Sequence, residues 1–144
     1  MDRLQAKHDA LKHLYTRLVD SRDGYERSRK EAETGAHREL FAQQIERRSR
    51  NAAEVRGFLA ADGVEMDDDG SLLAAAHRSW LSLRDVFSSG DDAVMAEVIR
   101  GEEELLSAYD DAIAAAGAGD QELDWLSAQY ADLKSVVQGL KADS

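Results

Sequence analysis

The sequence contains no cysteine and no proline among its 144 residues, and aromatic residues make up only 6% of it. Without cysteine there is no disulfide, no thiolate metal site and no cysteine nucleophile, which fits a reducing cytosol. Without proline nothing interrupts a long helix, and the glycines fall mostly in a few places. These absences predict a cytoplasmic protein made of long helices that are separated by short breaks.

Positive charge is also scarce. The chain carries 18 Lys and Arg against 29 Asp and Glu, which gives a formal net charge of -11, and most of the acidic excess falls in the second half. This charge repels the phosphates of nucleic acids and anionic lipids. Charged residues also interrupt the first twenty positions, so we expect neither a signal peptide nor a membrane helix there. The composition predicts an acidic protein that binds neither nucleic acid nor membrane.

Apolar residues recur every three or four positions in five segments, which is the spacing of amphipathic helices. The segments predict helices at residues 2–33, 36–61, 72–88, 91–116 and 120–141. The inward positions predicted for the four long helices are Leu4, Leu11, Leu18, Tyr25 and Ala32, then Phe41, Ile45, Arg48, Ala52, Val55 and Leu59, then Met95, Ile99, Glu102, Leu106, Tyr109, Ile113 and Ala116, and finally Leu123, Leu126, Tyr130, Leu133, Val137 and Leu140.

These helices predict one all-α domain over residues 1–144, because 43% of the residues are hydrophobic and the length suits a single core. Short connections make the first two long helices an antiparallel hairpin, and the last two another. The long stretch between the hairpins lets the second and third long helices run parallel, with the helix at 72–88 along this crossover. The expected fold is therefore a four-helix bundle with ferritin-like topology.

Local sequence strings add a family resemblance that extends from about Leu14 to Leu140. The sequence resembles a bacterial ferritin-like four-helix-bundle family, domain of unknown function 2383. The resemblance implies a bacterial, cytosolic, stress-associated protein of the ferritin-like superfamily, without an assigned biochemical activity. The strings that carry it are Leu40-Phe41, Glu46-Arg47-Arg48, His77-Arg78-Ser79-Trp80, Arg100-Gly101-Glu102-Glu103, Ala108-Tyr109-Asp110 and Gln129-Tyr130.

The resemblance raises the question of a carboxylate-bridged di-iron site. Such a site takes a Glu-x-x-His motif from each of two helices, because residues i and i+3 share one helical face. None of the four histidines follows a glutamate by three positions. The sequence therefore predicts no metal ligand and no cofactor. An all-carboxylate di-metal site is the alternative, and its candidate ligands on the two middle helices are Glu46, Glu54, Glu97 and Glu102.

Two charged residues interrupt the apolar seams, Arg48 midway along helix 36–61 and Glu102 in helix 91–116. An isolated buried charge is costly, so we predict a buried ion pair between them, with the hydroxyl of Tyr25 or Tyr130 satisfying the remaining polar atoms. The hypothesis places this pair at the level where metal-binding relatives hold their ions. The alternative is that both side chains lean outward and reach water.

No sequence pattern points to catalysis, because the chain has no nucleophile elbow, no phosphate loop and no Ser, His and acid spacing of a triad. We therefore predict no catalytic residues and a non-enzymatic bundle with a structural or protein-interaction role. Its partner would be another protein or a second copy of the chain. The alternative function is that of a metal-binding ferritin-like protein with the all-carboxylate site.

Overall fold

The computed structural model describes residues 3–31, 35–64, 91–117 and 122–142 of the chain. Within these ranges the protein is all-helical and has no strand, which confirms the predicted all-α class. The helix predicted at residues 72–88 lies outside the described residues. The four helices are α1 (Arg3–Glu31), α2 (Gly35–Ala61), α4 (Asp91–Ala116) and α5 (Glu122–Ala142).

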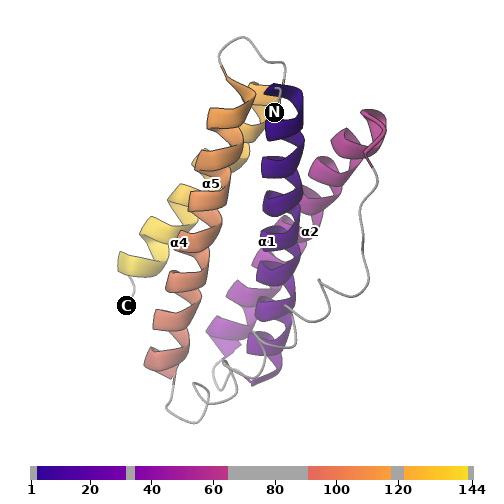
Figure 1. Ribbon diagram of the computed structural model, residues 1–144. Coiled ribbons are helices and arrows are strands. Elements are labelled where there is room, and N and C mark those ends of the chain that lie inside the picture. Colours follow the sequence, from indigo (N-terminus) through magenta and orange to yellow (C-terminus); the bar gives the residue numbers. More distant parts are fainter. Residues whose placement is uncertain (1–2, 32–34, 65–90, 118–121, 143–144) are drawn as a thin grey trace.

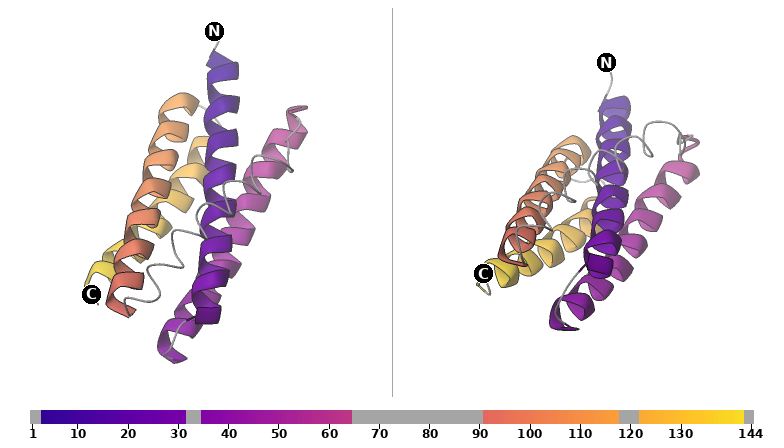
Figure 2. Two further views of the ribbon diagram at one scale, coloured as in Figure 1. Left: turned by 60° about the horizontal axis from the view of Figure 1, so that its bottom comes forward. Right: turned by 90° about the horizontal axis from the view of Figure 1, so that it is seen from below.

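The helices lie side by side, with α1 packed against α2 and α4, and α4 packed against α5 (Figure 1). Two contacts show which helix ends lie together at one end of the bundle. The Arg3 guanidinium donates to the carbonyl of Ala116 over 3.2 Å, and His8 bonds to Asp62 over 2.8 Å. The start of α1 therefore meets the ends of both α2 and α4, so α2 and α4 run in the same direction. Figure 2 shows the four helices from two further sides.

Glycine ends two of the helices. The chain turns after α2 at Gly63 with a φ of 76°, and after α4 at Gly117 with a φ of 77°. After α2, the Val64 amide donates to the carbonyl of Leu59 over 2.8 Å and the Gly63 amide to that of Ala60 over 3.0 Å. This is the Schellman pattern, which needs a left-handed residue that only glycine adopts at little cost.

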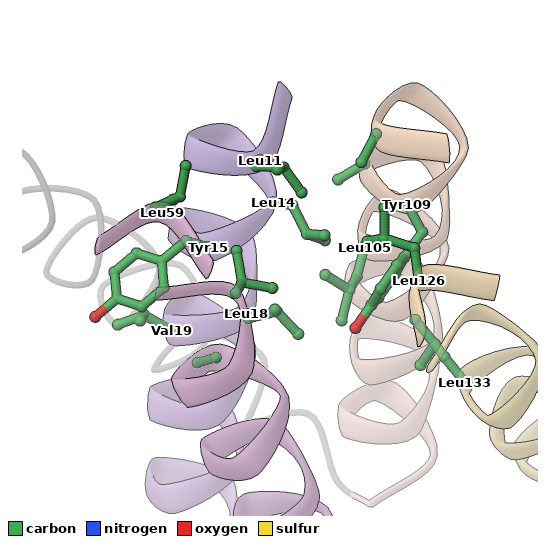
Figure 3. Close-up of a cluster of buried hydrophobic side chains, with 14 of the residues drawn as sticks. Leu11, Leu14, Tyr15, Leu18, Val19, Leu59, Leu105, Tyr109, Leu126 and Leu133 are labelled. Carbon is green, nitrogen blue, oxygen red and sulfur yellow. The ribbon is translucent and has the colours of Figure 1, made fainter. Parts of the chain in front are cut away.

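The larger of two apolar clusters lies in the half of the bundle that contains the first half of α1 (Figure 3). Side chains of all four helices meet there, and Figure 3 shows leucines of α1 facing those of α4 and α5. Burial of this apolar area is the main stabilising contribution to such a fold. The fully buried leucines, valine and tyrosine of this cluster are Leu11, Leu14, Leu18, Val55, Leu59, Leu105, Tyr109, Leu126 and Leu133.

Two details of the predicted seams are wrong. Leu4 is 53% exposed instead of inward. It lies in the first turn of α1, at the end of the bundle, where fewer helices surround it (Figure 2). In α4, Leu105 and Ala108 are fully buried, whereas Leu106 and Ile113 are only partly buried. A step of three or of four from Glu102 satisfies the same helical period, so spacing alone did not select between these paths.

A smaller apolar cluster closes the other half of the bundle, where Tyr25, Phe41, Met95 and Leu140 come together from the four helices. The rings of Tyr25 and Phe41 lie 5.6 Å apart at a tilt of 45°. None of the helices in the described ranges has the length and apolar character needed to cross a membrane.

Candidate functional site

A buried ion pair lies between the two apolar clusters. Arg48 of α2 is fully buried, Glu102 of α4 is 2% exposed, and a terminal guanidinium nitrogen of Arg48 donates to Oε2 of Glu102. The second carboxylate oxygen, Oε1, accepts a hydrogen bond of 2.9 Å from the hydroxyl of Ser21 in α1. Side chains from three helices thus meet at one carboxylate. Arg48 and Glu102 point into the bundle in this structure and do not lean outward to reach water.

The charge of Arg48 is held by its partner. Burial lowers the pKa of the Arg48 guanidinium, but the Glu102 carboxylate acts against this, and the resulting pKa is raised. Nitrogens Nε and Nη1 of Arg48 are buried and have no hydrogen-bond partner in the described residues. The Arg48 guanidinium therefore stays charged, and two of its nitrogens make no hydrogen bond to the described residues.

Tyr25 lies beside this ion pair. Its side chain is 3% exposed, and its hydroxyl makes no hydrogen bond to the described residues. Burial raises the pKa of Tyr25 well above its usual value; the negative charge of Glu102 raises it further, and Arg48 acts in the opposite direction. The phenol is therefore neutral at physiological pH and remains able to donate one hydrogen bond and to accept others.

Tyr130, the other predicted hydroxyl partner, lies elsewhere. Its ring packs edge-on against Tyr109 with centroids 6.4 Å apart, and the ammonium of Lys134 lies 5.9 Å above it. Partial burial and the nearby carboxylate of Asp110 raise the pKa of Tyr130. The structure therefore brings Arg48, Glu102 and Tyr25 together but leaves Tyr130 on the α4–α5 side.

A second polar network, which runs from the buried Tyr109 to the exposed Glu54, was not predicted from the sequence. The Tyr109 hydroxyl donates to Oε1 of Gln129 over 2.6 Å, and Nε2 of Gln129 donates to Glu54 over 2.7 Å. Burial raises the pKa of Tyr109, so the phenol remains a donor. The signal was present, because Gln129 stands three residues after Leu126 and therefore shares its inward stripe. The sequence pattern instead assigned the inward position to the neighbouring Tyr130, because an aromatic residue is more often buried than a glutamine.

A cavity of about 340 Å³ opens between α1 and α4 next to the ion pair. We call it the α1/α4 cavity. Ser21, Tyr25 and Glu102 contribute to its lining, so it reaches the buried polar centre. Its size falls at the lower end of the range of small-molecule pockets, roughly 300–1,000 Å³. The remaining lining residues are Arg17, Asp20, Gly24, Ser28, Glu97, Val98, Arg100, Gly101, Glu104 and Leu105.

Charged side chains of this lining form a chain of ion pairs from α4 to α1. Arg100 binds Glu97 over 2.9 Å and Glu104 over 2.7 Å. Glu104 lies 3.7 Å from Arg17, which in turn lies 4.0 Å from Asp20. These side chains are more exposed than Glu102, so they stand at the solvent side of the cavity. These five side chains, three carboxylates and two guanidiniums, together carry one net negative charge.

The carboxylates expected for a di-metal site do not converge. Glu46 and Glu54 are exposed, Glu97 is paired with Arg100, and Glu102 is paired with Arg48. Among the residues that the structure describes, no three carboxylates or histidines come close enough to hold a metal ion. The described residues therefore do not fit the carboxylate-bridged centre of the ferritin-like superfamily, which needs several oxygen and nitrogen ligands on each ion.

Comparison with known proteins adds one family assignment. A search of curated proteins found no significant match, and a search of solved structures likewise found none. A family model does match the chain over residues 6–115, which includes most of α1, all of α2 and most of α4. Because this match covers well over half of the sequence, the chain belongs to the family described as a domain of unknown function (DUF2383).

Proposed function

We propose that this protein is a non-enzymatic, ferritin-like four-helix bundle in which the Arg48–Glu102 pair occupies the level of the metal centre in metal-binding relatives. Its role is structural or that of a protein-interaction module. The family resemblance adds a bacterial, cytoplasmic and stress-associated setting to this proposal. The single observation that carries it is the fully buried guanidinium of Arg48, bound to the carboxylate of Glu102 in the middle of the bundle.

The reason is electrostatic. A metal ion that took Glu102 as a ligand would have to displace Arg48 and would leave a guanidinium charge buried without its partner. An unpaired buried charge costs several kcal/mol, on the order of 3–5. Repulsion between the metal and a nearby guanidinium adds to this cost, because the interior screens charges weakly.

The helix directions support the ferritin-like part of the proposal. α1 and α2 form one antiparallel hairpin, α4 and α5 form another, and α2 runs parallel to α4 (Figure 1). α2 therefore ends at one end of the bundle, and α4 starts at the other. Ferritin-like bundles have their second and third long helices in this arrangement and join them by a single long crossover.

Metal analysis tests the proposal most directly. The full chain is purified from cells supplemented with iron or manganese, dialysed, and measured by plasma mass spectrometry. We expect far less than one metal ion per chain in the wild type. Stoichiometric iron or manganese that survives dialysis and is lost in Glu102→Gln would overturn the proposal and favour the all-carboxylate alternative.

An interaction role is supported by the outer surface of α4. Glu103, Glu104, Asp110 and Asp111 are all exposed there. Like charges disfavour self-association through this surface, whereas a basic protein partner would be attracted. We therefore expect the chain to sediment as a monomer at low salt. A dimer that is stable at low salt and insensitive to charge reversal on α4 would favour the second-copy alternative.

A further inference from the structure

We propose that the α1/α4 cavity binds a small amino alcohol, with the hydroxyl of the ligand at the buried floor and its ammonium at the acidic mouth. This inference goes beyond the function proposed above and does not depend on it, because the ligand occupies the cavity beside the ion pair and leaves Arg48 bound to Glu102.

Small residues on both helices create the space. Gly24 and Ser21 of α1 face Gly101 of α4 across the cavity. A Cβ atom placed on Gly101 would meet no other atom within 4 Å. Gly101 is itself exposed, so this open position lies on the solvent side of the cavity, where a larger side chain has room to fill it.

The buried floor of the cavity, formed by Tyr25 and Glu102, has hydrogen-bonding positions that suit a ligand hydroxyl group. Tyr25 is only 3% exposed, and its hydroxyl has no hydrogen-bond partner among the residues that the structure describes. Glu102 accepts one hydrogen bond at each oxygen, from Arg48 and from Ser21, and a carboxylate has about four acceptor positions. A ligand hydroxyl can donate to Glu102 and accept from Tyr25 at once.

A neutral group fits the floor better than a charged one. The Arg48–Glu102 pair is already balanced, so an ammonium or carboxylate placed beside it would bring an uncompensated charge into a buried site. A hydroxyl brings no charge and satisfies the unpartnered phenol. The floor therefore selects hydroxyl over ammonium or carboxylate.

The mouth has the opposite preference. The ion-pair chain that runs from Glu97 to Asp20 carries one net negative charge, at a place where solvent still reaches it. A single ammonium would neutralise this charge. Val98 and Leu105 also line the cavity and offer apolar surface to a short methylene chain. Hydroxyl, methylenes and ammonium in this order define an amino alcohol.

Calorimetric titration of the full chain with 5-aminopentan-1-ol tests the inference. Three matched probes each remove one feature: pentylamine lacks the hydroxyl, 1-pentanol lacks the ammonium, and 5-hydroxypentanoate reverses the charge. We expect saturable binding of the amino alcohol and at least several-fold weaker binding of every matched probe. Absence of binding, or equal binding of the amino alcohol and 5-hydroxypentanoate, would overturn the inference.

Variants of the chain locate the site. Gly101→Leu fills the cavity and should weaken binding by more than tenfold. Gly57→Leu is the matched control, because Gly57 also has nothing within 4 Å of its Cβ position but lies on α2. Tyr25→Phe should weaken binding by about three- to tenfold, the usual effect of one lost hydrogen bond. Circular dichroism shows that each variant is folded. Unchanged binding in Gly101→Leu, or equal loss in Gly57→Leu, would contradict the site.

Discussion

The apolar layer around Leu14 and the polar layer around Glu102 both lie inside the bundle, but they hold it together in different ways. The apolar layer packs aliphatic side chains whose attraction has no preferred direction. The polar layer joins Arg48, Glu102 and Ser21 through directed hydrogen bonds from three helices. The first supplies most of the stability, whereas the second fixes which residues face each other, since a shifted helix would leave a charge unpaired.

The largest expected effect comes from separating the charges of the polar layer. Glu102→Leu leaves Arg48 buried without its partner, so unfolding free energy should fall by ~3–5 kcal/mol. Arg48→Met combined with Glu102→Leu removes both charges and should be near neutral or stabilising. Chemical denaturation of the single and double variants measures the coupling. Additive single effects, with coupling below about 0.5 kcal/mol, would show that the two side chains do not interact.

Truncation of a side chain in the apolar layer should lower stability, and no second substitution of the kind described for the ion pair is expected to restore it. Leu14→Ala removes a fully buried side chain and should cost ~2–5 kcal/mol. Leu4→Ala is the matched control, because Leu4 is 53% exposed and its loss should change stability by less than about 0.5 kcal/mol. Thermal unfolding of both variants compares them. A similar cost at the two positions would mean that the core lies elsewhere on α1.

Alkaline pH should act on the tyrosines of the two layers. The pKa values of Tyr25 and Tyr109 are raised in the folded protein, mainly by burial. Their contribution to stability is therefore fully present below the unfolded value of about 10 and is lost as pH rises through the folded values. Denaturation midpoints should fall above that pH.

The matched variants for this pH effect are Tyr25→Phe and Tyr109→Phe, which should each flatten the alkaline loss of stability. Absorbance of tyrosinate measures the ionisation directly. Full ionisation of all four tyrosines near their ordinary pKa, with the helices intact, would show that neither phenol is shielded.

The smallest expected effects come from two glycines on α2 and its end. Gly57 lies exposed inside the helix, so Gly57→Ala should stabilise by ~0.5–1 kcal/mol. Gly63 ends the helix with a φ of 76°, so Gly63→Ala should destabilise by ~1–2 kcal/mol. Thermal unfolding separates the two directions. Stabilisation by both substitutions would contradict the left-handed turn at Gly63.

Particular residues show how far sequence reasoning reached in the candidate site. Arg48 and Glu102 were recognised because each is a charged residue within an apolar seam, and a buried charge is stable only when an opposite charge lies beside it. Tyr25 followed from the same seven-residue spacing as Leu11 and Leu18. Ser21 and Gln129 were missed because small or neutral polar residues at inward positions look the same as polar residues on a solvated surface. The α1/α4 cavity was not predicted, because empty space has no sequence signal of its own.

By itself the sequence determined the helical class, since helical period and glycine position are local properties that each segment carries alone. It also indicated where charge could enter the interior, because Arg48 and Glu102 lie within apolar stripes, but only the structure decided between a buried pair and two outward side chains. Tertiary structure alone decided which hydroxyl reaches the ion pair and which of Leu105 and Leu106 is buried. Those outcomes depend on rotations of whole helices by a fraction of a turn, and only the simultaneous packing of all four helices fixes such rotations.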